Sequence, residues 1–542
     1  MIEKKWWEGE WIYYLFFILI LCVYVTAMLI TIMDIDAAQL ASISDQMLDE
    51  HSFLQVKHRD IDYLDKPPLL FWAAALTIRL FGIGSISYKL LPVLGLIFSV
   101  YCIYRLVRLY YSKETALVAS VILASCQAYF TMANDIRAEN LLIGSICFAI
   151  WQLSAYLETK KPLNLYAGFA GIGLAMLAKG PIGIILPAFT IGSMLIVKKN
   201  YRAINFRWLM AIPIIGLILL PMCIGLYLQH GTKGLEFYFW TQSFGRITGQ
   251  SEWQNSAGPF FFAHSFMWIF LPFSIIFLPA LYTSFRDIIK GNPATKLIEY
   301  GSLGGFMITM IALSFSNYKL PHYIYIVCPL AAVLTAVYIT EKIKLLNIKI
   351  LHLIQMVSMA LLLASSVVLF HIFNEGYPVF LIALLLGVVT AFWWLWRNLE
   401  RWRSLVLISA LVMTFINLEL NTAFYPKLLT YQSPSEAAFY IRENKIDTDK
   451  IISYNVYGNS MSYYLDTIVP FYSEIEDLKM MKDGTLVYTD EEGLRNLKKA
   501  NLNFRVLRSF DDFPVTRVTF MFLSPGTREE VTSKRHLVRL SN

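Results

Sequence analysis

Thirteen apolar runs of about membrane-spanning length recur along this 542-residue chain and constrain its fold more than any other feature. A spanning helix needs about 20 consecutive apolar residues, because the hydrocarbon core of a bilayer is about 30 Å thick. Apolar residues make up 57% of the chain and charged residues only 16%. The sequence therefore predicts a polytopic α-helical membrane protein with about 13 spans. The runs lie near 12–33, 88–107, 114–131, 139–157, 163–178, 181–197, 208–228, 259–283, 300–316, 321–340, 350–371, 378–396 and 403–422.

Basic residues between the runs indicate which loops are cytoplasmic, since such loops carry an excess of Lys and Arg. The net charge of +7 does not indicate a nucleic-acid partner, because the Lys and Arg residues are spread between the apolar runs and do not form a patch on a soluble domain. The first run is too long for a cleavable signal peptide, so we expect an uncleaved span. The predicted cytoplasmic gaps hold Lys4/Lys5, Arg105/Arg108/Lys113, Lys160/Lys161, Lys198/Lys199/Arg202/Arg207, Arg286/Lys290/Lys296, Lys342/Lys344/Lys349 and Arg397/Arg401/Arg403.

The segment 67–82 is apolar enough to count as a further span. Counting it would place the arginines after residue 104 outside, against the charge rule. We therefore predict an interfacial or re-entrant helix within a first outer loop of residues 33–88. The odd number of spans then places the C-terminal region on the outer side. We therefore expect a transmembrane domain, 1–424, and a C-terminal extracytoplasmic domain, 425–542.

Residues 425–542 differ from the rest in their dense charge and short apolar runs, which predicts a small α/β or α+β domain. Ser433-Pro434-Ser435-Glu436 matches a capping box with proline at the first helical position, so we expect a helix to about Asn444. Residue patterns predict strands at IISYN, GTLVYT, FRVLR and RVTFMFL and a helix at EEGLRNLKKA.

Ten charged residues fall at the predicted outer ends of spans or in outer loops, where ionisable groups are costly and usually functional. Several cations with a few carboxylates suit a phosphate ester on a lipid tail. A carboxylate among them can take a proton from a hydroxyl nucleophile. The pattern thus favours transfer from a lipid-linked sugar phosphate. These residues are Asp34, Asp36, Asp65, Lys66, Asp135, Arg137, Glu139, Lys179, Arg246 and Lys319.

The order of these residues resembles the GT-C class of integral-membrane glycosyltransferases that use polyprenyl-phosphate sugars, in particular the lipid A aminoarabinose transferase and protein-mannosyltransferase families. The first outer loop of these families begins with an aspartate and closes on an acidic-Lys-Pro-Pro element, as Asp36 and 65–68 do here. The resemblance covers about residues 10–335. The other similar segments are GLAMLAKGPIGIILP with Lys179, FWTQSFGRITG with Arg246, and SNYKLPHYIYIVCPLAAVL with Lys319 and Tyr323.

The resemblance implies an inverting glycosyltransferase in a bacterial inner membrane, with a periplasmic active site. It would move a sugar from undecaprenyl phosphate to a lipid A-like or protein acceptor, as a monomer. Asp36 would be the base or acceptor orienter, and Asp34 and Glu139 are further catalytic candidates. The expected ligands of the donor phosphate are Lys66, Lys179, Arg246, Lys319 and Arg137, with Asp65 and Tyr323 close by.

No cofactor is predicted. Some relatives bind a divalent metal through the acid before Lys-Pro-Pro and a histidine near 258–259, but this chain has EWQNS at 252–256. The six cysteines lie in apolar runs without metal-ligand spacing, and His51, His58 and His322 are interpreted as loop or boundary residues. Two other functions remain open. A flippase would need polar groups through the membrane and usually a repeat, and a receptor or scaffold would use the spans only as an anchor.

Overall fold

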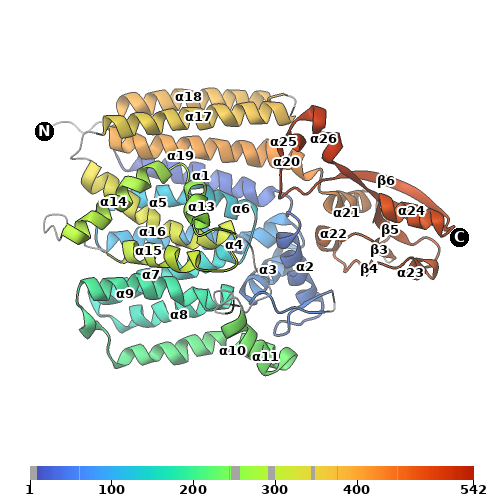
Figure 1. Ribbon diagram of the computed structural model, residues 1–542, viewed down its shortest axis with the longest axis horizontal. Coiled ribbons are helices and arrows are strands. Elements are labelled where there is room, and N and C mark those ends of the chain that lie inside the picture. The colour runs from blue at the N-terminus through green and yellow to red at the C-terminus, as the bar shows by residue number, and fades with distance from the viewer. Residues whose placement is uncertain are drawn as a thin grey trace.

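A computed structural model describes residues 9–59, 61–242, 245, 257–290, 300–343, 348–374, 376–448 and 450–541. Helices run side by side through most of the chain, and a small domain with a β-sheet covers one end of this bundle (Figure 1). The main bundle helices are α1 (Trp11–Leu29), α4 (Ser85–Arg108), α5 (Lys113–Ala124), α6 (Gln127–Asn134), α7 (Glu139–Thr159), α8 (Pro162–Lys179), α9 (Ile182–Val197), α10 (Ala211–His230), α13 (Phe261–Ile269), α14 (Ser274–Lys290), α15 (Gly301–Ser314), α16 (Cys328–Val337), α17 (Lys349–Asn374), α18 (Val379–Asn398) and α19 (Arg401–Glu419).

All thirteen predicted runs fall on helices, and the chain is a multi-pass membrane protein. Among the described residues, eight helices are long and apolar enough to cross a membrane, or nine if the bent pair α5 and α6 forms one span. The other runs fall on the shorter or less apolar helices α8, α9, α13 with α14, and α15, so the count of thirteen stays a prediction. Short elements link the bundle helices: η2 (Tyr201–Ala203), η3 (Phe206–Met210), α11 (Thr232–Glu236), η4 (Phe237–Thr241), η6 (Pro321–Val327), η7 (Tyr338–Lys342), η9 (Leu420–Phe424) and α20 (Tyr425–Leu429).

The predicted first outer loop contains α2 (Asp36–Asp49), a two-stranded hairpin of β1 (Lys57–His58) and β2 (Ile61–Asp62), and α3 (Leu69–Phe81). Both helices lie at the end of the bundle that the C-terminal domain covers (Figure 1). At 13 residues, α3 is about 20 Å long, too short to cross the hydrocarbon core. This length supports the interpretation of 67–82 as an interfacial or re-entrant helix.

Glycines set the spacing of the helices that carry the site. A Cβ on Gly144 of α7 would lie 2.8 Å from the carbonyl oxygen of Gly95 on α4, so these two backbones touch. A Cβ on Gly171 of α8 would lie 3.0 Å from the backbone nitrogen of Ala149 on α7. Small residues permit such close packing of helices in a membrane. Since α7 begins with Glu139 and the adjacent α8 ends with Lys179, these two side chains meet at one end of the bundle.

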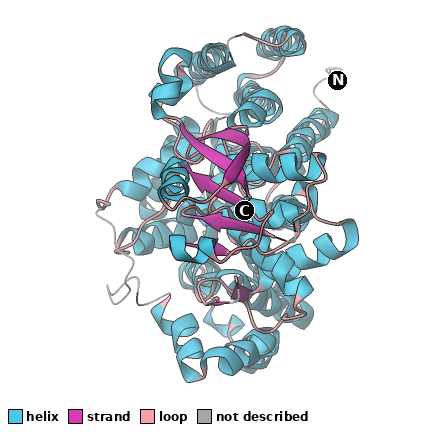
Figure 2. Cartoon of the chain, turned by 90° about the vertical axis from the view of Figure 1, so that its right-hand side faces the viewer, coloured by secondary structure: helices cyan, strands magenta, loops and turns pink. Residues whose placement is uncertain are grey.

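The C-terminal domain has a five-stranded sheet in the order β4-β3-β5-β7-β6, with helices around it, as the view onto this end shows (Figure 2). β3 pairs in parallel with β4 and β5, whereas β7 pairs antiparallel with β5 and β6. This mixed topology confirms the predicted α/β or α+β fold. The elements are α21 (Ser433–Glu443), β3 (Ile451–Tyr454), α22 (Asn459–Leu465), β4 (Phe471–Tyr472), α23 (Ile475–Lys479), β5 (Leu486–Asp490), α24 (Glu491–Lys499), β6 (Phe504–Asp512), α25 (Phe520–Leu523), α26 (Pro525–Val531) and β7 (Ser533–Leu540).

The predicted strand RVTFMFL is wrong, because Phe520–Leu523 forms the helix α25. Phe522 is fully buried there, with its ring stacked 3.8 Å from that of Phe513 and close to Phe373 of α17. Phe522 thus packs against the bundle and not within the sheet, whereas Phe520 is 89% exposed. The strand β7 was not predicted, since its basic residues Lys534, Arg535 and Arg539 obscure the apolar alternation.

The predicted capping box is also wrong, although α21 does begin at Ser433. Gln432 occupies the cap position, but its side chain accepts no capping hydrogen bond from a backbone N–H of the helix. The Ser433 hydroxyl instead donates to Asp512 Oδ1 at 2.5 Å and lies 2.6 Å from the Tyr488 hydroxyl. Tertiary contacts to two strands of the sheet therefore replace the local capping bond.

Candidate functional site

Two adjoining cavities lie at the end of the bundle where α7 begins and α8 ends. The first, of about 120 Å³, is lined largely by apolar side chains that include Leu142, Ile182 and Ile185. The second, of about 190 Å³, is lined by charged and polar side chains that include Asp36 and Arg137. Both cavities are bordered by the same four residues, Lys66, Glu139, Lys179 and Tyr323. The site therefore has an apolar part and a polar part that meet at two lysines.

The polar residues come from the ends of separate elements. Asp36 is the first residue of α2, and Lys66 immediately precedes Pro67 and Pro68, which lead into α3. Arg137 lies in the turn between α6 and α7, and Tyr323 lies in η6. Proline fixes the backbone φ angle, so the two prolines hold the Lys66 side chain in a defined direction. Residues distant in sequence thereby meet at one place.

The Arg137 guanidinium bridges two carboxylates. Its Nη1 lies 2.9 Å from Asp36 Oδ2, and its Nε lies 2.9 Å from Asp135 Oδ2. The Asp36 side chain is 61% exposed, whereas those of Arg137 and Asp135 are largely buried. Arg137 is thus anchored by Asp135 and orients the Asp36 carboxylate, which stays open to the polar cavity.

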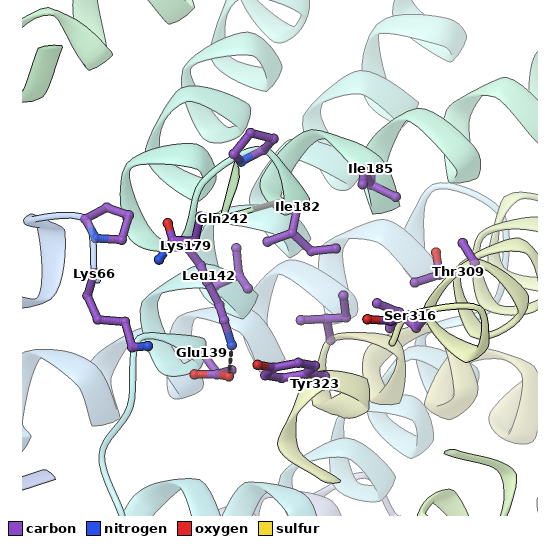
Figure 3. A pocket seen from close by; sticks show the side chains of 15 residues that line it. Lys66, Glu139, Leu142, Lys179, Ile182, Ile185, Gln242, Thr309, Ser316 and Tyr323 are labelled. Atoms are coloured by element: carbon purple, nitrogen blue, oxygen red, sulfur yellow. Dashed lines mark hydrogen bonds and ion pairs between the residues drawn. The ribbon is translucent and has the colours of Figure 1, made fainter. Parts of the chain in front are cut away.

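A second cluster is built around Glu139, whose side chain is 3% exposed. Lys179 forms an ion pair with Glu139 Oε1, and His322 Nε2 lies 3.4 Å from the same oxygen. Lys179 Nζ also lies 4.5 Å from the centroid of the Tyr323 ring. Figure 3 shows Lys179 meeting Glu139 beside Tyr323, with Lys66 extending toward the same pocket from another element. Two cationic groups and a carboxylate are thereby held at the junction of the cavities.

Breaking the Glu139–Lys179 pair is expected to destabilise the protein strongly. Removal of one partner of a buried ion pair leaves an uncompensated charge and costs about 3–5 kcal/mol. We expect Glu139→Gln and Lys179→Met each to lower the thermal unfolding temperature in detergent. The unfolding temperature of the double variant should fall by much less than the sum of the two single decreases, because neither charge is then left without its partner. Strictly additive losses would show that the two side chains do not interact.

Lys66 pairs with its neighbour Asp65, with Nζ 2.6 Å from Oδ2. Both side chains are partly exposed, at 31% and 40%, so this ion pair contributes little to stability. A bound anion can therefore compete with Asp65 for Lys66 at small cost. Among the Lys and Arg residues that border the two cavities in the described part of the chain, Lys66 has the most exposed side chain, at 31% against 26% for Arg137 and 19% for Lys179.

The structure brings together most of the predicted site residues, leaves two outside and does not describe one. Lys319 Nζ donates to the carbonyl oxygen of Ala257 at 3.0 Å, and Lys319 does not border either cavity among the described residues. Arg246 lies outside the described residues. Asp34 lies away from the cluster and is treated next. Those that meet are Asp36, Asp65, Lys66, Arg137, Glu139, Lys179 and Tyr323.

Asp34 contacts the C-terminal domain. Its carboxylate accepts hydrogen bonds from the Ser460 backbone N–H at 3.1 Å and from the Ser460 hydroxyl at 2.5 Å. Its own backbone N–H donates to Gln432 Oε1 at 2.8 Å. Because these contacts occupy the side chain and it borders neither cavity, the geometry gives Asp34 a structural role in joining the two domains.

Asp34 is expected to make stability depend on pH. Burial raises the pKa of Asp34 to about 6, and the hydrogen bonds from Ser460 offset this only in part. The folded protein thus holds this proton more tightly than the unfolded chain. The stabilisation is complete below about pH 4 and is lost as pH rises through about 6, a change of roughly 2–3 kcal/mol. Asp34→Asn keeps a hydrogen-bond partner for Ser460 and removes the titrating proton. Between pH 4 and pH 7, the unfolding temperature of this variant should therefore fall less than that of the wild type. Parallel pH profiles of the two proteins would contradict this assignment.

Sequence reasoning missed His322 and Gln39, which both border the polar cavity. His322 contacts Glu139, although it was interpreted as a boundary residue. Its position directly before Tyr323, in the segment that carries Lys319, is the signal that could have identified it. Gln39 gives no such signal, since only the turn of α2 brings it beside Asp36.

The described side chains beside Lys66 do not form a set of metal ligands. Among the described residues, Asp65 belongs to no group of three His, Cys or carboxylate side chains close enough to share an ion. His264 is exposed on α13, and 251–256 lie outside the described residues. A cationic lysine pairs with Asp65 at this position. No chemical step is derived through a metal at this site.

Comparisons with known proteins agree with this architecture. Residues 65–224 match the family model described as dolichyl-phosphate-mannose-protein mannosyltransferase. A protein of Aquifex aeolicus is 27% identical over 278 residues, 51% of this chain and 61% of the relative. The undecaprenyl phosphate-α-4-amino-4-deoxy-L-arabinose arabinosyl transferase of Shewanella sediminis is 23% identical over 350 residues, 62% of this chain and 61% of that one. The chain thus spans about three fifths of the length of these relatives.

The crystal structure of ArnT from Cupriavidus metallidurans bound to undecaprenyl phosphate superposes with a TM-score of 0.76 at 17% identity and covers 97% of both chains. The chain therefore shares the fold of this ArnT structure, which confirms the GT-C-like fold expected from the sequence. Within that class the chain resembles the aminoarabinose transferases and the protein mannosyltransferases, which confirms the resemblance expected from the sequence.

Proposed function

We propose that this protein is a glycosyltransferase that moves a sugar from a polyprenyl phosphate carrier to a lipid or protein acceptor. The observation that carries this proposal is the meeting of an apolar and a polar cavity at Lys66, Glu139, Lys179 and Tyr323. An amphiphilic donor needs this arrangement, with a slot for its isoprenoid and cations for its phosphate. Undecaprenyl phosphate is the carrier favoured by the relatives, since the ArnT structure from Cupriavidus metallidurans holds it.

The isoprenoid units nearest the phosphate would lie in the apolar cavity among Leu142, Ile182 and Ile185, with the rest of the chain in the bilayer. The phosphate would lie at the junction, where Lys66 exchanges its exposed partner Asp65 for the ligand. Lys179 keeps its pair with Glu139 and contributes positive charge at short range. The sugar would then project into the polar cavity, toward Asp36.

In the proposed reaction, the acceptor hydroxyl gives its proton to the Asp36 carboxylate while its oxygen attacks the anomeric carbon of the sugar. The bond from that carbon to the phosphate oxygen breaks, its electron pair stays on the phosphate, and polyprenyl phosphate leaves. Attack opposite the phosphate inverts the anomeric carbon. Arg137 orients the base, and Lys66 stabilises the charge that develops on the phosphate.

We place this site on the periplasmic face of a bacterial inner membrane. The positions of the basic loops support this orientation, since the site lies at the end of the bundle opposite the predicted cytoplasmic gaps. The C-terminal domain, which lies at the same end, would then be periplasmic as well. A lipid A-like molecule or a protein is the proposed acceptor. We propose that the protein acts as a monomer, since one chain supplies every described residue that lines the polar cavity.

Mass spectrometry of cell-envelope glycolipids and glycoproteins tests the proposed function. A strain lacking the protein should lose a sugar from one lipid or protein, and the gene for the wild-type chain should restore it. The same gene with Asp36→Asn should not restore it, although the protein is made and inserted. An unchanged glycan profile, or full restoration by Asp36→Asn, would overturn the proposal. Loss of lipid translocation without loss of transfer would instead support the flippase hypothesis.

A further inference from the structure

Three carboxylates converge at the contact between the first outer loop and the C-terminal domain. Asp45 and Asp49 lie one turn apart on α2, and Asp466 directly follows α22, which packs against α2. One oxygen from each of the three side chains lies within 4.8 Å of the other two. The cluster lies outside the two cavities described above, since none of its members borders them.

A second observation concerns the burial of Asp45. This residue is only 7% exposed, yet its carboxylate accepts no hydrogen bond and forms no ion pair with any described residue. Burial of an unpaired carboxylate is costly, so such groups are paired or bind metal ions in native proteins. Its carboxylate points toward those of Asp49 and Asp466, which adds repulsion to the cost of burial.

The nearby basic groups do not neutralise this cluster. Arg442 and Lys445 border a cavity together with Asp466, and Arg442 directs its Nη1 to the backbone carbonyl oxygen of Tyr464 at 3.1 Å. Lys445 forms no ion pair with Asp466 in the described part of the chain. Lys57 pairs with Glu50, the residue that follows α2, and with none of the three aspartates. Neither Asp49 nor Asp466 forms an ion pair within the described part of the chain. Three carboxyl groups thus converge without an ion pair to a cationic side chain among the described residues.

We propose that Asp45, Asp49 and Asp466 bind one Ca²⁺ ion that links the first outer loop to the C-terminal domain. Calcium prefers six to eight oxygen ligands at about 2.3–2.6 Å, so two of its ligands lie at most about 5 Å apart, as these oxygens do. The absence of nitrogen and sulfur donors from the group disfavours zinc. The exposed sides of Asp49 and Asp466 leave room for water molecules to complete the coordination.

The ion would hold the helix that presents the catalytic base. α2 begins with Asp36 and carries Asp45 and Asp49 near its other end. Asp34, two residues before the start of this helix, already accepts a hydrogen bond from Ser460 of α22. Calcium would add a contact at the far end of α2, so that both ends are fixed to the C-terminal domain. Binding of the ion does not depend on the proposed transferase activity and can be tested without it.

The test uses the full-length protein in detergent, stripped of metal with EDTA and then titrated with CaCl₂. Calcium should raise the unfolding temperature by on the order of 5 °C, and equilibrium dialysis with ⁴⁵Ca should show one ion per chain. Asp45→Asn should abolish both effects. It should also raise the unfolding temperature in EDTA, because it removes a buried, repelled charge. Asp477→Asn, a change at a partly exposed position in the same domain, is the control and should keep the full response.

Asp466→Asn provides a second variant that should fold, since Asp466 is exposed and has a positive φ of 57° that asparagine tolerates. It too should lose the calcium response. No shift and no bound ion at about 10 mM Ca²⁺, ten times the weakest usual extracellular affinity, would overturn the proposal. An equal response in wild type, Asp45→Asn and Asp466→Asn would overturn it as well.

Discussion

Asp36→Asn is expected to lower the rate of sugar transfer by about 10²–10⁴-fold, the usual contribution of a general base. The amide keeps the shape of the side chain and can still contact Arg137, but it cannot accept the proton of the acceptor hydroxyl. Donor binding should change little, because the phosphate contacts Lys66 and not Asp36 in our account. The measurement is the initial rate of transfer from a radiolabelled lipid donor in detergent or vesicles.

Asp62→Asn is the matched control for this variant. Asp62 belongs to the same outer loop, is exposed, and accepts a hydrogen bond from Gln229 at 3.0 Å without bordering the polar cavity. Its replacement should leave the rate within about twofold. Retention of most of the wild-type rate by Asp36→Asn would remove Asp36 from the role of base.

Lys66→Met is expected to weaken binding of the polyprenyl phosphate donor by about 10–100-fold. A hydrogen bond to a charged group contributes about 1.5–3 kcal/mol, and methionine keeps the apolar stem of the side chain while removing the charge. Stability should hardly change, because the Lys66–Asp65 pair is partly exposed. The dissociation constant for undecaprenyl phosphate, measured by titration in detergent, tests this prediction.

Lys57→Met is the control, because Lys57 lies in the same loop and pairs with Glu50 away from both cavities. It should bind the phosphorylated lipid as the wild type does. The dephosphorylated lipid, undecaprenol, should bind equally to the wild type and to Lys66→Met. An unchanged affinity of Lys66→Met for undecaprenyl phosphate would show that the phosphate lies elsewhere.

The sequence predicted the helices of the bundle well, because a long apolar run in a membrane can satisfy its backbone hydrogen bonds in few structures other than a helix. It also predicted that Asp36, Lys66, Arg137 and Lys179 would gather, since charged residues at the ends of spans are held at one depth by the bilayer. The cavities border all four. Their common position along the membrane normal was predictable, whereas their individual partners were not.

The partners depend on tertiary packing that has no local signal. Asp34 and Asp36 are the same residue type at nearly the same place in the sequence. The backbone at the start of α2 nevertheless directs Asp34 toward Ser460 and Asp36 toward Arg137. His322 faces Glu139 only because η6 packs against α7. The buried carboxylate of Glu139 contacts Lys179 and His322, and its pairing with Lys179 suits a structural role better than the catalytic role first considered.

The C-terminal domain shows the same limit in its secondary structure. The composition of the segment with Phe520 and Phe522 predicts a strand. Burial of Phe522 against Phe373 of the bundle favours the helix that the structure shows. The charged strand β7 forms because β5 and β6 pair with it on both sides. Neither outcome is encoded within the segment itself.

Binding of undecaprenyl phosphate, compared with undecaprenol, to the purified chain tests most directly whether the two cavities form one donor site. We predict one phosphorylated lipid per chain, with undecaprenol at least about tenfold weaker. Ile182→Trp, which fills the apolar cavity, should weaken both lipids by about tenfold or more, whereas Ile196→Trp, at a 63% exposed position on the same helix, should weaken neither. Equal affinity for the two lipids, or no effect of Ile182→Trp, would contradict the account.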